Sequence, residues 1–172
     1  MSDVIKTNYY NQKCGVSEKI YAHKYKELHK AFSVFLHDGN GNMLIQKRAK
    51  DKYHSGGLWT NACCSHPLSD DVRTEAMQRM NEELGFSCNI EFVDEFIYYT
   101  EFDNGISEFE LDHIFIGECE NKQITSYDES EVEEIKWIST EELIEDVCEN
   151  PSKYTKWFIT ALYIVVRHLN QR

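Results

Sequence analysis

The segment from Gly57 to Pro67 brings together the side chains with the greatest capacity for chemistry. Cys64 and His66 stand two residues apart in it. In an extended segment, residues at this spacing point to the same face, so the thiol and the imidazole would share one side of a strand. The pair would place a proton-transfer group beside a metal ligand. A buried structural cysteine next to a histidine satisfied in the core explains the pair alone equally well.

A second pair at the same spacing is formed by Glu108 and Glu110, in a segment that alternates acidic and apolar residues. On a strand the two carboxylates would share a face, while Phe109 and Leu111 occupy the other. This alternation is also typical of the wet side of a sheet. Three imidazoles added to the pair would give a mixed nitrogen and oxygen shell, which suits Zn²⁺ or Mn²⁺ in five- or six-fold coordination. A structural zinc site would favour cysteine ligands instead.

The formal net charge of −12 argues against nucleic acid and anionic membranes as partners. A phosphorylated small substrate would therefore need a local basic pocket. Lys47, Arg48, Lys50 and Lys52 stand against the single acid Asp51, a local excess of positive charge. The cluster is either such a pocket or the solvated end of a strand.

The length of 172 residues suits one domain with an ordinary core. No apolar run reaches the roughly 20 residues that a membrane helix needs. The six cysteines are not arranged as a disulfide framework, and the N-terminus lacks the apolar core of a secretory signal. We therefore expect a single domain over residues 1–172, reduced and cytoplasmic.

Hydrophobic periodicity and turn residues predict the elements that position these side chains. Strands are expected over residues 31–37, 43–47, 92–102, 106–116 and 132–138. A helix should begin after Ser69 or Asp70 and end at Leu84, with Gly85 in the left-handed conformation. A capping box at Ser139 should open a short helix that ends near Asn150, and residues 152–169 should form the last helix. This order predicts an α+β fold with a mixed sheet between helices.

Several segments, taken together and in order, resemble type I isopentenyl diphosphate isomerase, an enzyme of the Nudix superfamily. The resemblance runs from about Lys19 to about Trp157, and the segments that carry it are His23 and His29, 30–35, 57–67, 81–85, 108–113 and 156–158. It implies a Nudix-like α/β/α sandwich. It also implies interconversion of isopentenyl and dimethylallyl diphosphate by metal-dependent, flavin-free proton transfer through a tertiary carbocation.

The resemblance also implies roles for individual residues. Catalytic roles fall on Cys64, Glu110, Tyr98 and Trp157, and diphosphate contacts fall on Lys19, Arg48, Lys52 and Arg79. The ligands of one divalent ion (Mn²⁺, Zn²⁺ or Mg²⁺) would be His23, His29, His66, Glu108 and Glu110, and Glu83 would hold Mg²⁺ with the substrate diphosphate. The partner would be a small-molecule diphosphate, and the protein would be a monomer or homodimer. The remaining histidines (His37, His54, His113 and His168) lie outside the matching motifs, and we expect them to be structural or on the surface.

Gln78-Arg79 stands where a Nudix hydrolase would carry Arg-Glu. The chain departs from the isomerase pattern in three places. Gly56-Gly57 stands where Pro-Gly is common, His23 and His29 are matched through their flanks and not through the spacer between them, and Cys63 precedes Cys64 directly. A slip of one residue would therefore put the wrong thiol on the face of His66. The alternatives are a Nudix hydrolase acting on a diphosphate-containing substrate, for which the acidic box is incomplete, and a non-catalytic metal-binding module.

Overall fold

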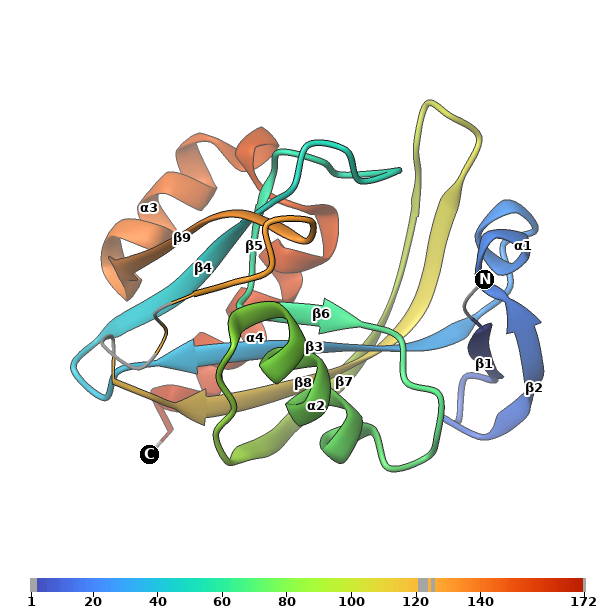
Figure 1. The fold of residues 1–172 in the computed structure, drawn as a ribbon, viewed down its shortest axis with the longest axis horizontal. Coiled ribbons are helices and arrows are strands. Elements are labelled where there is room, and N and C mark those ends of the chain that lie inside the picture. Colours follow the sequence, from blue (N-terminus) through green and yellow to red (C-terminus); the bar gives the residue numbers. More distant parts are fainter. Residues whose placement is uncertain (1–2, 121–123, 125, 172) are drawn as a thin grey trace.

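The computed structural model describes residues 3–120, 124 and 126–171. Within them, nine strands join in one sheet, as Figure 1 shows. The strands are β1 (Asp3–Thr7), β2 (Lys13–Glu18), β3 (His29–His37), β4 (Asn42–Arg48), β5 (Trp59–Thr60), β6 (Cys63–Ser65), β7 (Ile90–Glu101), β8 (Ser107–Glu118) and β9 (Val132–Ser139). The helices are α1 (Lys19–Lys24), α2 (Val72–Leu84), α3 (Thr140–Glu149) and α4 (Lys156–Leu169). That residues 1–172 form one functional domain stays a prediction, and the outermost residues of that range lie outside the described part.

Strand β3 is central to the sheet and makes it mixed. It runs parallel to β8 and antiparallel to β1, β4 and β6. The long hairpin of β7 and β8 extends beyond the body of the sheet, on the same side as the loop that follows β4 (Figure 1). The parallel register places His29, the first residue of β3, opposite Glu110 of β8. Two predicted metal ligands are thus neighbours because of strand pairing.

The two faces of the sheet carry separate apolar cores. Phe32 and Val34 of β3 pack in a cluster with Met80 of α2. Phe35, which follows Val34 on β3, points to the other face and packs in the second cluster with Phe158 of α4. The period-two alternation of β3 therefore serves both layers, and the predicted α/β/α sandwich is confirmed. No helix in the described part of the chain is long and apolar enough to span a membrane.

Local signals place most element ends correctly, with two corrections. Asp71, rather than Ser69 or Asp70, caps α2 by accepting from the Thr74 amide, and Gly85 ends that helix with φ of 60° as expected. The last helix begins at Lys156, because Tyr154 pairs with Trp59 and the Thr155 amide donates to the Trp59 carbonyl at 3.0 Å. A 3₁₀ turn at Pro151–Lys153 occupies the rest of the predicted helical start. Strands β1, β2, β5 and β6 and helix α1 were not predicted.

Candidate active site

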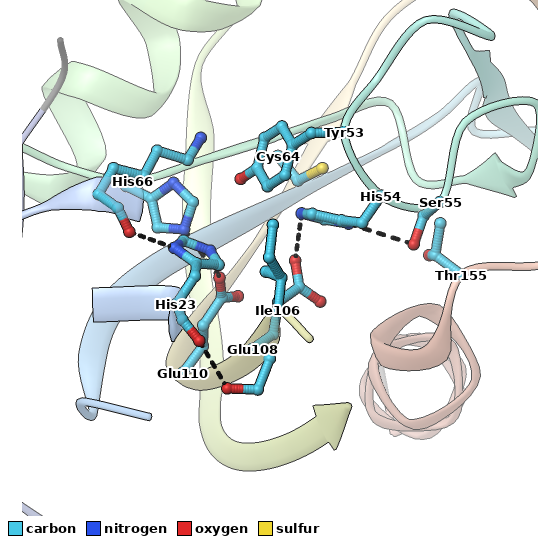
Figure 2. Close-up of polar contacts among 12 residues, drawn as sticks. His23, Tyr53, His54, Ser55, Cys64, His66, Ile106, Glu108, Glu110 and Thr155 are labelled. Atoms are coloured by element: carbon cyan, nitrogen blue, oxygen red, sulfur yellow. Dashed lines mark hydrogen bonds and ion pairs between the residues drawn. The ribbon is translucent and has the colours of Figure 1, made fainter. Parts of the chain in front are cut away.

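Three imidazoles converge on one carboxylate oxygen. Glu110 Oε1 lies 2.7 Å from Nε2 of His66, 3.4 Å from Nε2 of His29 and 3.9 Å from Nε2 of His23. One ligand atom from each of these four residues lies within 4.8 Å of all the others. The four come from α1, β3, β8 and the residue after β6, so only the folded chain assembles them. Figure 2 shows His23, His66 and Glu110 pointing toward one another.

The outward nitrogens of two of these imidazoles are held by the backbone. Nδ1 of His23 donates to the Lys19 carbonyl at 2.6 Å, and Nδ1 of His29 donates to the Glu27 carbonyl at 2.7 Å. These bonds leave the Nε2 lone pairs facing Glu110, where both atoms are buried without a hydrogen-bond partner. Unpaired buried nitrogens are costly, and a divalent ion would satisfy them. The donor set therefore fits a metal ion such as Mn²⁺ or Zn²⁺.

Glu108, the fifth predicted ligand, belongs to a second and overlapping group. Its Oε2 lies 3.1 Å from the Tyr98 hydroxyl oxygen, and its Oε1 lies 3.0 Å from Nε2 of His54. Ligand atoms of His23, His54 and Glu108 also lie within 4.8 Å of one another. The two carboxylates are 3% and 5% exposed, so their strand face is not the wet side of the sheet.

The two glutamates differ in their electrostatic surroundings. Burial, reinforced by the charge of Glu110, raises the pKa of Glu108 well above its ordinary value. Burial alone would also raise the pKa of Glu110, but His66 and His29 hold it well below. The Tyr98 hydroxyl donates to Glu110 Oε2 at 2.5 Å and thus bridges the two side chains. The metal-free site therefore favours one negative charge, placed on Glu110.

Of the two expectations for His54, a surface position is excluded, because this buried residue lines the same cavity as Glu108 and Glu110. It is 7% exposed and lies on the loop between β4 and β5. No motif marks it in the sequence, since its contact with Glu108 joins two segments that only the tertiary structure brings together. The other three histidines outside the motifs do not line this cavity.

Cys64 lines the cavity, whereas Cys63 does not. Cys63 is fully buried in the core beneath α2, whereas Cys64, one residue along β6, lines the cavity together with His66. The shared face expected for Cys64 and His66 is therefore present. Burial raises the pKa of the Cys64 thiol to about 12, against the opposing influence of Arg48, whose Nη1 lies 3.7 Å from the sulfur. The group is a neutral thiol at physiological pH.

Trp157, the second residue of α4, lines the cavity with its indole 4% exposed. Its ring lies 6.2 Å from that of Tyr98, and its Nε1 donates to Oδ1 of Asn61 at 3.2 Å. Asn61 was not predicted as a site residue. Its amide donates to the Cys63 carbonyl at 2.6 Å, so one fully buried side chain links the indole to the strand of Cys64.

The four predicted diphosphate contacts all belong to this cavity. Lys19, Arg48, Lys52 and Arg79 all line it. Lys47 and Lys50 of the basic cluster instead pair with Glu133 at 3.0 and 3.6 Å and do not line the cavity. The pocket interpretation therefore holds for only part of the cluster.

Two acids accompany the basic residues. Glu83 is 3% exposed and lies 2.9 Å from Arg79 Nε. Glu131, which was not predicted, pairs with Lys52 and lies 3.1 Å from Arg79 Nη2. Within the described residues, Glu131 thus stands as the counter-ion of two predicted diphosphate contacts.

Comparison with known proteins gives a consistent family assignment. The model of the Nudix domain matches residues 27–158. An isopentenyl-diphosphate Delta-isomerase 2 of Photorhabdus laumondii is 42% identical over 84% of this chain and 81% of its own length. The protein of the same name from Aromatoleum aromaticum is 37% identical over 97% of this chain and 89% of its own length.

Solved structures share the fold at much lower identity. A protein of Deinococcus radiodurans superposes with a TM-score of 0.69 at 14% identity, covering 87% of this chain and 90% of that one. The MutT protein of Methanosarcina mazei gives a TM-score of 0.65 at 13% identity, covering 84% of this chain and 96% of that one. The sequence relatives, together with this shared fold, show that the chain belongs to the isopentenyl-diphosphate Delta-isomerases of the Nudix superfamily.

Proposed function

We propose that this protein interconverts isopentenyl and dimethylallyl diphosphate by metal-dependent protonation and deprotonation. One observation carries the proposal. A single cavity is lined by a carboxylate within a histidine cluster, by the Cys64 thiol, by the indole of Trp157 and by four basic side chains. These are the groups that a proton transfer on a short alkenyl diphosphate requires, and the names of the relatives agree with it.

The basic side chains of the cavity would bind the diphosphate. The guanidinium groups of Arg48 and Arg79 match phosphate geometry, and Lys19 and Lys52 add point charges. Binding would require Lys52 and Arg79 to exchange Glu131 for phosphate oxygens. Glu83, next to Arg79, would hold Mg²⁺ together with the diphosphate, since Mg²⁺ is commonly bound by one or two carboxylates plus substrate phosphates.

His23, His29, His66, Glu108 and Glu110 would hold the second divalent ion. When bound, that ion would withdraw electron density from the Glu110 carboxyl group and make its protonated form a stronger acid. A strong acid is what a weakly basic alkene needs. The reaction moves a proton and transfers no electrons, so we propose no flavin.

Glu110 and Cys64 would then handle the two protons. In the forward direction one proton is added to C4 of the substrate, which gives a tertiary cation, and one is removed from C2. Tyr98 donates to Glu110 and would assist the carboxyl group in its transfer. Trp157 would place a π-face beside the cation, a contact worth roughly 2 kcal/mol when desolvated.

Hydrolysis of a diphosphate-containing substrate is disfavoured by helix α2. Where a hydrolase would carry Arg-Glu, this helix has Gln78 and Arg79, and Arg79 pairs with Glu83 instead of adding an acid. The cavity also places a thiol and an indole where hydrolysis has no use for them.

Incubation with isopentenyl diphosphate in D₂O, followed by NMR, tests the proposal. We expect deuterium to enter the substrate pool and dimethylallyl diphosphate to accumulate, without release of phosphate. Release of phosphate without deuterium incorporation would refute the isomerase and favour the hydrolase. No reaction in the presence of Mg²⁺ and either Mn²⁺ or Zn²⁺ would refute both enzymes.

A further inference from the structure

His54 stands at the edge of the proposed metal site with both of its nitrogens engaged. Its Nε2 lies 3.0 Å from Oε1 of Glu108, and its Nδ1 lies 3.3 Å from the Ser55 hydroxyl. With that hydroxyl as donor to Nδ1, the ring proton resides on Nε2, the nitrogen that lies 3.0 Å from Oε1 of Glu108. Figure 2 shows this arrangement, with His54 approaching Glu108 from the side of the loop.

The loop that carries His54 is fixed by contacts on several sides. The His54 ring stacks on Phe102 of the β7–β8 turn, with centroids 4.7 Å apart and planes 18° from parallel. Asn104 of the same turn donates to the Tyr53 carbonyl at 2.9 Å. Gly56 lies so close to the loop backbone that a Cβ there would stand 2.4 Å from the Lys50 carbonyl oxygen. His54 is therefore held in place before any ligand arrives.

Without His54, one oxygen of Glu108 would lack a partner. Oε2 lies 3.1 Å from the Tyr98 hydroxyl and Oε1 lies 3.0 Å from Nε2 of His54, while the side chain is only 4% exposed. In the ionised form of Glu108 that would bind a metal, a buried carboxylate oxygen without a donor is costly and free to rotate. Hydrogen bonds to a ligating carboxylate orient it, and loss of such an outer partner typically lowers metal affinity about 10–100-fold.

We propose that His54 is a positioning residue of the metal site. Through its Nε2 contact, His54 holds Glu108 in the orientation in which the carboxylate binds the ion. His54 does not itself bind the ion in this proposal. The inference rests on the proposed function only in assigning Glu108 to the metal, and metal affinity tests it independently of isomerase activity.

A crossed pair of substitutions separates the hydrogen bond from the ring. His54→Phe keeps a ring to stack on Phe102 but removes the donor. His54→Gln removes the ring but places an amide donor near the position of Nε2. His113→Phe is the matched control: His113 is also a buried imidazole near a carboxylate, 3.5 Å from Glu95, and it does not line the cavity.

The measurement is the dissociation constant for Mn²⁺ and for Zn²⁺, obtained by chelator competition on metal-stripped protein, with thermal unfolding of each metal-free variant as a check on folding. We expect His54→Phe to weaken binding about 10–100-fold. His54→Gln and His113→Phe should stay within about threefold of the parent.

Three results would overturn the proposal. Unchanged affinity in a folded His54→Phe protein would show that the contact with Glu108 has no role in metal binding. Equal weakening by Phe and Gln would assign the effect to the ring stack. Complete loss of metal from both variants would make His54 a direct ligand. Because no substrate is present, none of these results depends on whether the protein is an isomerase.

Discussion

Replacing Trp157 by Leu should slow the chemical step far more than it weakens binding of the diphosphate. The indole is 4% exposed and lines the cavity, so water would screen little of its interaction with a substrate cation. A desolvated cation–π contact of roughly 2 kcal/mol corresponds to about a 30-fold loss in kcat. Trp157→Phe keeps a smaller π-face and should fall between the parent and the Leu variant.

The substitution also affects stability, and this effect must be measured separately. The indole N–H donates to Asn61 at 3.2 Å, a bond worth about 1 kcal/mol, and truncation leaves a void that costs up to roughly 3 kcal/mol more. Asn61 Oδ1 keeps its bond from the Thr60 hydroxyl at 2.9 Å, so it is not left unpaired. Thermal unfolding should therefore show a destabilised but folded protein, and kinetics should be recorded well below its melting temperature.

Arg48→Ala provides the contrast. A guanidinium–diphosphate contact exists in the ground state and the transition state alike, so its loss should raise KM more than it lowers kcat. The Arg48 guanidinium also lies 5.5 Å from the centroid of the Trp157 ring, so the effects of the two substitutions should not simply add.

A tertiary-amine diphosphate that mimics the cation provides the decisive assay. Its inhibition constant should rise about 30-fold in Trp157→Leu, while the binding of isopentenyl diphosphate changes only a few-fold. If the amine and the substrate weaken by the same factor, Trp157 is a packing residue and the reasoning fails.

Cys64→Ser should lower turnover at least 10²–10⁴-fold, whereas Cys63→Ser should keep most activity because Cys63 is buried away from the cavity; equal losses would contradict this. His29→Ala should lower metal content and activity together, as metal analysis would show, and one tightly held ion in a variant lacking all three clustered histidines would place the site elsewhere. Alkylation of Cys64, followed by peptide mass spectrometry, should accelerate about tenfold per pH unit to about pH 11, since burial raises its pKa to about 12. Arg48→Ala should slow that alkylation by raising the pKa further, and a plateau near pH 9 would show an ordinary thiol.

Helices α2 and α3 could be predicted from the sequence, because their caps and the buried stripe of α2 are formed by residues close together in the chain. Val72, Ala76, Met80 and Leu84 recur every four positions, and all four are buried along α2 up to the left-handed Gly85. The Ser139 cap of α3 was equally readable, since its hydroxyl accepts from the Glu142 amide three residues on. Such contacts are short in sequence, so the pattern contains them.

Long-range pairing decided the elements that the sequence misplaced. The start of α4 is set by hydrogen bonding of Thr155 to Trp59, and Thr155 Oγ1 donates further to Thr60 at 2.9 Å. The short strands β5 and β6 exist because β4 and β3 offer them partners. Neither has enough residues to show a period of its own.

The candidate site divides in the same way. The motifs that carry the family resemblance predicted the three histidines and Glu110 as ligands. The spacing of two residues predicted that Cys64 and His66 share a face. The structure alone brings His54 to Glu108 and Glu131 to Lys52 and Arg79. These partners meet across loops whose course depends on sheet register and backbone packing. Residue types and short spacings can be read directly from the sequence. Contacts between side chains distant in the sequence depend on a tertiary arrangement that no single segment specifies.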